Sequence, residues 1–276
     1  MKKVEELIEV FSPNRLSTLA VCHYRFFRQY VMEEKRPKTP ALAFGNAWDE
    51  TTNICYQESM EEGIPFTNKR KAKDVFAWQW DQEKEEVEDW GVGEKPGEIQ
   101  HAGLKLASLW TAEVASELLP VKVQASWEVS WQEIPWRVRG VMDLIAKPIR
   151  QKKLILVDNK TARRRWKRAK SLYSLQAPAY SLAAQSLLGE EIDEFYFHVA
   201  IRKKNPEIQV EWVNVDQKAK QQFIRKVAFA RKLVQDLYKS GVWLPTGRDS
   251  QHFLCSRKYC PYWQECEKEW GGEVAD

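Results

Sequence analysis

A short segment in the middle of the chain combines a carboxylate and a lysine with a block of positive charge. In LILVDNKTARRR, residues 154–165, four apolar residues precede Asp158, Asn159 and Lys160, and three arginines follow. Side chains two positions apart on a strand share a face, so a strand here points Asp158 and Lys160 the same way and Asn159 the opposite way. Asp143 lies near the end of the preceding apolar segment, and hairpin pairing of the two segments would place it beside Asp158.

The expected proximity of Asp143 and Asp158 predicts a metal site. Two neighbouring carboxylates repel each other unless a cation lies between them, and hard oxygen ligands select Mg²⁺ or Mn²⁺. Such a metal binds a phosphate oxygen and a water together and lowers the pKa of that water. Lys160 would position or deprotonate the water. The Asp-x-Lys pattern alone is weak, because an ordinary ion pair at a strand end has the same sequence.

The charge is distributed unevenly along the 276 residues. The net charge is +4, but residues 147–170 carry eleven lysines and arginines against one acid, whereas residues 81–98 carry eight acids against two lysines. We interpret the basic stretch as a surface that holds phosphates and the acidic stretch as a solvated face. The charged start MKKVEELIEV is unlike a signal peptide, and no apolar run approaches the roughly 20 residues of a membrane span. We therefore expect a cytoplasmic protein without membrane contact.

The hydrophobic periodicity predicts an α/β fold with a mixed sheet flanked by helices. Alternation of apolar and polar residues indicates strands, and Gly189 and Pro178 mark the end and the first turn or kink of a helix between them. The expected order is helices 42–60 and 68–118, strands 121–131, 136–146 and 153–158, helix 169–189, strands 194–204 and 207–215, and helix 216–241.

Four short motifs in this order resemble the RecB-like branch of the PD-(D/E)XK nuclease superfamily. That branch has the pattern G-x-x-x-H, G-x-x-D, (D/E)-x-K and Q-x-x-x-Y, and the matching segments are GNAWD (45–49), GVMD (140–143), DNK (158–160) and QAPAY (176–180). Each motif alone is common by chance, so the resemblance depends on the four occurring in order on fitting elements. It implies a restriction-endonuclease-like fold with a helical N-terminal region and a C-terminal cysteine cluster.

The resemblance also implies the roles of the site residues. Asp143 and Asp158 would be metal ligands, the Asn159 carbonyl a third ligand and Lys160 the catalytic lysine. Gln176 and Tyr180, one helical turn apart, would orient the lysine or touch the DNA backbone. The chain departs from the family at Asp49, where the family usually has histidine. Either this carboxylate takes over as a metal ligand or the site has decayed.

Three of the five cysteines form a C-terminal group, CSRKYCPYWQEC, with Cys255, Cys260 and Cys266. A cytoplasmic chain is not expected to join them as disulfides, so a metal site is the default interpretation. Three thiolates need a fourth ligand, for which Cys22 and Cys55 are the upstream candidates. Zinc suits four thiolates, and buried unligated cysteine is the remaining alternative.

The segment SPNRLSTLAVCHYRF around Cys22 resembles the iron–sulfur members of the RecB-like branch, in which one N-terminal cysteine joins three at the C-terminus. These relatives include nuclease subunits of AddAB-type repair enzymes and CRISPR-associated nucleases. The resemblance implies a 4Fe-4S cluster on Cys22, Cys255, Cys260 and Cys266, with Zn²⁺ as the alternative. The first C-terminal gap of four residues is longer than the two that are usual in AddAB-type members.

Together these features predict a stand-alone nuclease. We expect one PD-(D/E)XK domain over residues 1–276, with a helical elaboration at about 58–118 and a cluster-binding segment at about 250–270. The expected activity is Mg²⁺- or Mn²⁺-dependent hydrolysis of DNA, most simply as an exonuclease on single strands or duplex ends, in recombination, repair or CRISPR adaptation with a protein partner from such a pathway. The alternative is a decayed DNA-end-binding or scaffold protein. The expected DNA-binding residues are Arg163, Arg164, Arg165, Trp166, Lys167 and Arg168, with an exposed Trp166 able to stack on an unpaired base.

Overall fold

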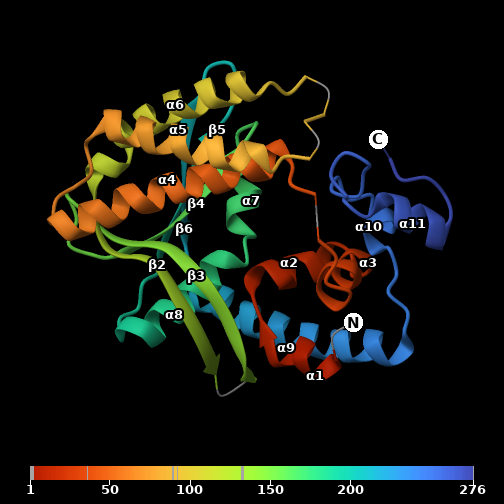
Figure 1. Ribbon diagram of the computed structural model, residues 1–276. Coiled ribbons are helices and arrows are strands. Elements are labelled where there is room, and N and C mark those ends of the chain that lie inside the picture. Colours follow the sequence, from red (N-terminus) through yellow and green to blue (C-terminus); the bar gives the residue numbers. More distant parts are fainter. Residues whose placement is uncertain (1–2, 36, 89, 92, 132–133, 276) are drawn as a thin grey trace. The chain divides into compact units, whose positions relative to one another are not determined.

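The computed structural model describes residues 3–35, 37–88, 90–91, 93–131 and 134–275 (Figure 1). The chain divides into two compact units. The first comprises Met1–Arg36, Glu128–Gly140 and Gln217–Asp276, and the second comprises Pro37–Trp127 and Val141–Asp216. The single nuclease domain expected from the sequence stays a prediction.

Three helices of the second unit lie next to one another (Figure 1): α4 (Pro40–Glu62), α5 (Lys69–Glu85) and α6 (Pro96–Glu113). The Thr39 hydroxyl caps α4 by accepting a hydrogen bond from the Leu42 amide, and Gly63 ends the helix with φ 69°. The helical region predicted over 68–118 contains two α-helices, α5 and α6, with an interruption between them. Gly93, with φ 84°, lies in the interruption between α5 and α6, and a proline takes the first position of the next helix.

A six-stranded mixed sheet runs through the chain in the order β1-β3-β4-β5-β6, with β2 paired to β3. Strands β3 and β4 are antiparallel, β4 and β5 are parallel, and β5 and β6 are antiparallel. Helices α7 and α8 make the crossover from β4 to β5. This architecture confirms the predicted α/β class and its mixed sheet. The bounds are β2 (Leu118–Trp131), β3 (Ile134–Pro148), β4 (Ile155–Ala162), α7 (Arg168–Leu172), α8 (Gln176–Leu188), β5 (Glu194–Ile201) and β6 (Glu207–Asn214).

The two faces of β4 are buried against different partners. Ile155 and Val157 belong to the aromatic core that includes side chains of α4, α5 and α6. Asp158 faces the other way, where the Tyr180 hydroxyl of α8 lies 3.4 Å from its carboxylate. Pro178 is in the first turn of α8, one of the two places expected for it. The period of two along β4 therefore separates the core from the polar side chains.

The first unit brings segments from both ends of the chain together. Its elements are α1 (Val4–Glu9), β1 (Val10–Phe11), α2 (Pro13–Val21), α3 (His23–Phe26), the π-helical turn η1 (Phe27–Val31), α9 (Gln217–Ser240), α10 (Thr246–Asp249) and α11 (Trp263–Trp270). The His23 amide donates to the Thr246 hydroxyl at 3.1 Å, and the Tyr24 amide donates to the Leu244 carbonyl at 3.0 Å. These bonds join the start of α3 to the segment after α9. Over the part of the chain that is described, a helix of sufficient length and apolarity to traverse a bilayer is absent.

His198 on β5 is expected to make the protein sensitive to acid. The side chain is 5% exposed, its Nδ1 has no hydrogen-bond partner among the described residues, and burial lowers its pKa to about 4. The unfolded chain binds a proton at this histidine below about pH 6.5, whereas the folded protein binds it only near pH 4. The free energy of unfolding is therefore at its full value above pH 6.5 and decreases as the pH falls toward 4. The full loss is about 3 kcal/mol for a shift of this size. Urea unfolding of wild type and His198→Gln from pH 7 to 4 should show a shallower decline for the variant.

The exposed His101 of α6 provides the matched control. His101→Gln should keep the wild-type pH dependence. A His198→Gln variant whose stability falls as steeply as that of the wild type between pH 6.5 and 4 would show that other groups cause the acid loss.

Candidate active site

Asp143 and Asp158 meet across the pair of strands β3 and β4. The antiparallel register pairs Leu144 with Val157, so Asp143 and Asp158 are the next residues along the two strands beyond this pair. The Asn159 amide donates a hydrogen bond to Asp143 Oδ2 at 2.7 Å. Asp158 is fully buried. Burial, followed by repulsion from Asp158, raises the pKa of Asp143 well above its usual value.

Lys160 forms an ion pair with Asp158 Oδ2 on the same face of β4, as the alternation along the strand predicts. Burial lowers the pKa of Lys160, but the carboxylates of Asp158 and Asp143 outweigh this effect and leave the pKa above its usual value. Lys160 is therefore a cation at neutral pH. Burial likewise raises the pKa of Asp158, and the nearby ammonium opposes that shift.

Gln176 and Tyr180 hold the other oxygen of Asp158. The Gln176 amide donates to Asp158 Oδ1 at 3.0 Å, and the Tyr180 hydroxyl lies 3.4 Å from the same atom. The two side chains also touch each other at 3.3 Å, as expected for positions one turn apart on α8. The Tyr180 ring also makes an edge contact with the Trp127 ring and a tilted contact with the Phe195 ring.

Asp49 on α4 is a half-buried neighbour of this group. Burial raises its pKa, and the charges of Lys160 and Asp158 act on it in opposite directions. Asn159 is 6% exposed, and its side-chain oxygen and nitrogen have no hydrogen-bond partner in the described part of the chain. The three carboxylates repel one another and form a donor set that suits a hard divalent cation. The Asn159 side chain points to the opposite face of β4 from Asp158, so it is not part of this set. Among the described residues, no group of three Asp, Glu, His or Cys side chains is close enough to share one ion.

Comparison with known proteins identifies the family. The family model of the PD-(D/E)XK nuclease superfamily matches residues 10–267. The chain belongs to this superfamily. A protein from Eubacterium rectale, described as a "putative exonuclease", has a similar crystal structure with a TM-score of 0.54 and 11% sequence identity, over 88% of this chain and 86% of that one. At this identity the structural likeness concerns the fold alone. A comparison with curated proteins gives no match.

As a PD-(D/E)XK protein, the chain has the fold and the motif order expected of a nuclease. Nucleases of this superfamily generally use divalent metal ions, in keeping with the carboxylates on β3 and β4. The five residues predicted to be catalytic, Asp143, Asp158, Lys160, Gln176 and Tyr180, form one connected group in the structure. Their roles, and those of Asp49 and Asn159 as metal ligands, stay predictions.

The basic block of the nuclease, residues 163–168, begins directly after β4. Three of its arginines form ion pairs: Arg163 with Glu94, Arg165 with Glu207 at 3.3 Å, and Arg168 with Glu211 at 3.3 Å. The solvated face predicted for the acidic stretch 81–98 is wrong at Glu94, which is only 13% exposed. Arg164 and Lys167 are exposed. Part of the positive charge expected to meet DNA is therefore already neutralised within the protein.

Trp166 is half-buried, so the exposed indole expected from its charged surroundings is wrong. Its ring lies 5.3 Å from the Phe197 ring, and the Lys170 ammonium lies 4.0 Å above it. The Gln209 side chain bonds both to the amide and to the carbonyl of Trp166, at 2.8 and 3.1 Å. Burial, followed by repulsion from Lys160, lowers the pKa of Lys170, whose ammonium group contacts the indole. Stacking of Trp166 on a base stays a prediction.

The four cysteines expected to bind a cluster gather in the first unit of the nuclease. A Cβ atom placed on Gly247 would lie 3.3 Å from Cys255 Cβ and 3.4 Å from Cys22 Cβ, so these two residues flank one glycine. Burial, followed by the charges of Cys260, Cys22 and Cys266, raises the pKa of Cys255 to about 11. Cys55 instead lies in the aromatic core of the second unit.

Sequence reasoning missed the residues of other segments that surround the basic block. Glu94, Gln209 and Lys170 contact residues of the basic block, and Arg202 pairs with Glu94, but none of the four belongs to a motif. The only sequence feature that could have pointed to Arg202 is its place at the end of a predicted strand, followed by two lysines. Nothing near Glu94 distinguishes it from the other acids of its stretch.

Proposed function

We propose that this protein is a metal-dependent deoxyribonuclease that removes nucleotides from single-stranded DNA or from duplex ends. The observation that carries the proposal is the full set of contacts around Asp158: Gln176 and Tyr180 on one carboxylate oxygen and Lys160 on the other. A buried carboxylate fixed in this way, opposite a second carboxylate, is more than a surface ion pair. The basic block that follows β4 supplies charge for a phosphate backbone.

The residues that would hold the metal ion are Asp143 and Asp158, with Asp49 and the Asn159 carbonyl as further oxygen ligands. When bound, a divalent ion supplies Lewis-acid polarisation of the phosphate and a water of lowered pKa. Asp143 and Asp158 have pKa values raised by burial, and their mutual repulsion adds to the shift of Asp143. A cation between them removes that cost, which makes this donor set a fitting site.

The remaining residues of the site orient groups and stabilise charge. Lys160 is protonated, so it is suited to stabilise the negative charge that develops on the phosphate oxygens and to orient the attacking water. Gln176 and Tyr180 are positioning residues, because they donate to Asp158 Oδ1 and so fix the direction of Oδ2, which pairs with Lys160. This arrangement matches general requirements for phosphodiester hydrolysis, in which preorganised charge supplies much of the rate.

The choice of DNA ends as substrate rests on the RecB-like motifs, and the description of the Eubacterium rectale protein as a "putative exonuclease" agrees with it. The same motifs support a role in recombination, repair or CRISPR adaptation. A basic surface beside the catalytic strand can bind the backbone of single-stranded DNA and of a duplex end alike, so both are kept as substrates.

The first unit is proposed to carry a 4Fe-4S cluster on Cys22, Cys255, Cys260 and Cys266. The thiols are near enough to shift one another's pKa, yet no three of the described metal-ligating side chains are close enough to hold one ion. The resemblance of the segment around Cys22 to iron–sulfur members of the RecB-like branch favours the cluster, and Zn²⁺ on the same four thiolates is the alternative.

A DNA-binding scaffold with a decayed site is the second candidate, and the observation that favours it is the carboxylate of Asp49 in place of the family histidine. Labelled single-stranded and blunt duplex DNA, incubated with Mg²⁺, with Mn²⁺ or with a chelator, separates the two functions. We expect shortening from an end in the presence of either metal alone. Retention of DNA without any shortening in either metal would establish the scaffold and refute the nuclease.

A further inference from the structure

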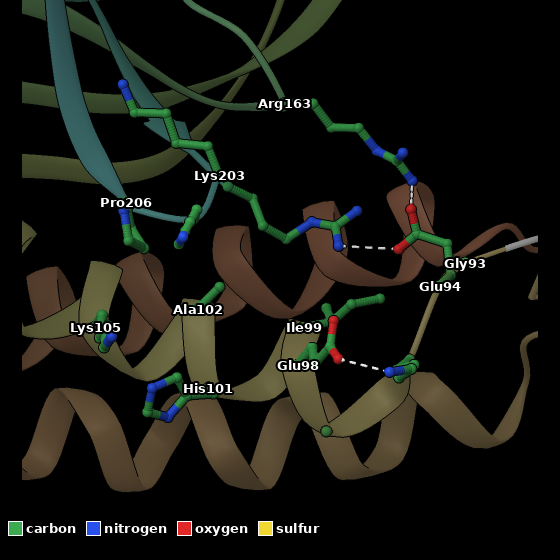
Figure 2. Close-up of a pocket in the computed structure, with 14 residues that line it drawn as sticks. Gly93, Glu94, Glu98, Ile99, His101, Ala102, Lys105, Arg163, Lys203 and Pro206 are labelled. Atoms are coloured by element: carbon green, nitrogen blue, oxygen red, sulfur yellow. Dashed lines mark hydrogen bonds and ion pairs between the residues drawn. The ribbon is translucent and has the colours of Figure 1, made fainter.

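A basic cavity of about 460 Å³ lies in the second unit, outside the group of residues assigned to catalysis (Figure 2). It is bounded by the start of α6 and by the residues that follow β4 and β5. Six of its lining residues are lysines or arginines, and only two are acids: Lys95, Lys105, Arg163, Arg202, Lys203 and Lys204 against Glu94 and Glu98. Such an excess of cations in a concave site attracts anions.

The Glu94 carboxylate occupies the position between the two arginines. Its Oε1 forms an ion pair with Arg163, and its Oε2 lies 3.0 Å from Arg202 Nη1. Figure 2 shows the Arg163 side chain extended toward Glu94. Two guanidinium groups that converge on one pair of oxygen atoms form the geometry with which proteins bind a phosphate. Glu94 is thus a carboxylate in a place suited to a phosphate.

Arg202 is held in place independently of Glu94. Its backbone amide donates to the Ala162 carbonyl at 2.7 Å, and its guanidinium lies 5.4 Å from the centre of the Phe44 ring. The side chain is 13% exposed. Removal of the Glu94 charge would therefore leave Arg202 in the cavity with an unsatisfied cation rather than release it into solvent.

The rest of the cavity keeps unneutralised charge. Lys95 pairs with Glu98 at 3.0 Å and Lys203 pairs with Glu207 at 2.8 Å, whereas Lys105 and Lys204 have no ion-pair partner within the described ranges. Lys105 and Lys204 therefore leave positive charge in the cavity for an anionic ligand. A phosphate brings more charge and more acceptor oxygens than a carboxylate.

We propose that this cavity is a phosphate-binding subsite for the nucleic-acid strand and that Glu94 is the internal carboxylate that the phosphate displaces. The inference rests on the proposed nuclease function and deepens it. The phosphate comes either from a strand terminus or from an internal phosphodiester, since the two share the oxygens that the guanidinium groups recognise.

The position of the cavity along the chain fits a strand that also reaches the catalytic residues. Arg163 is three residues beyond Lys160, which corresponds to roughly 10 Å along an extended chain. Phosphates of one DNA strand are spaced about 3.4 Å apart along a duplex axis, so the subsite lies within a few nucleotides of the proposed cleavage position. Occupation of the cavity would fix the register of the strand at the metal.

Two variants test the subsite in opposite directions. Glu94→Gln removes the competing charge and should strengthen binding of a short single-stranded oligonucleotide about fivefold or more, whereas Arg202→Gln should weaken it by a similar factor. Fluorescence anisotropy in chelator measures binding without cleavage. Oligonucleotides with a 5′-phosphate, with a 3′-phosphate and with neither distinguish the two sources of the phosphate. If Glu94→Gln strengthens binding only when a terminal phosphate is present, the cavity binds a strand end. If it strengthens binding of all three oligonucleotides, the cavity binds an internal phosphate.

Glu117→Gln and Arg70→Gln are the matched controls, because both side chains form ion pairs in the same unit but lie outside the cavity and outside the basic stretch. The subsite is refuted when the cavity variants shift affinity no more than these controls. Thermal melting verifies that each variant is folded, and Arg202→Lys replaces Arg202→Gln if the latter unfolds. Calorimetric titration with inorganic phosphate separates this proposal from the nuclease function. Tighter phosphate binding by Glu94→Gln than by Glu117→Gln supports the subsite even in a protein that cuts no DNA, and equal binding in such a protein rejects both.

Discussion

Lys160→Ala and Asp158→Asn are each expected to lower the rate of metal-dependent DNA cleavage by at least about 10²- to 10³-fold, the usual effect of removing one preorganised electrostatic contact. Lys160 is the cation nearest to the carboxylates, and Asp158 is the carboxylate on which Lys160, Gln176 and Tyr180 converge. Binding of DNA should change little, because the phosphate contacts expected from the basic block remain. Single-turnover cleavage together with anisotropy in chelator measures the two quantities separately.

Two exposed residues of the same unit serve as controls for the loss of charge. Lys69→Ala and Asp74→Asn change the same kinds of side chain away from the site, and both should cut at the wild-type rate. Wild-type cleavage by Lys160→Ala or by Asp158→Asn would show that β4 is not the catalytic strand. Loss of both binding and cleavage, with an altered melting temperature, would instead indicate a structural role for the Asp158–Lys160 pair.

Cys22→Ser is expected to remove both the colour and much of the stability of the first unit. Protein purified without oxygen should be brown with broad absorbance near about 400 nm, as thiolate-ligated iron clusters show. Cys22 lies between α2 and α3, whereas Cys255, Cys260 and Cys266 follow α9, so a shared cluster links segments from both ends of the chain. Because ligand binding contributes to folding, its loss should lower the unfolding free energy by several kcal/mol.

Cys55→Ser is the control, since Cys55 lies in the core of the second unit. Burial is the main cause that raises the pKa of its thiol to about 12. This variant should keep the absorbance and the iron content. Colourless wild-type protein with one equivalent of zinc would refute the iron–sulfur cluster while preserving the link between the chain ends. Absorbance that survives in Cys22→Ser but disappears in Cys55→Ser would assign the fourth ligand to Cys55.

The sequence by itself determined the arrangement along each element. The period of two on β4 placed Asp158 and Lys160 on one face, and the spacing of four on α8 placed Gln176 beside Tyr180. Such placements need only local geometry, because side-chain direction repeats with a fixed period in a strand or helix. The order of the four motifs predicted the superfamily, which the match over residues 10–267 confirms.

The tertiary structure alone decided which distant residues meet. The acidic stretch is predicted to be a solvated face, yet Glu94 is half-buried between two arginines that follow different strands. Trp166 lies among cations in the sequence, yet Phe197 and Lys170 cover its ring. His198 reads as an ordinary strand residue, and only its burial lowers its pKa to about 4. Burial and electrostatic pairing depend on segments far apart in the chain, and no local periodicity encodes the partner.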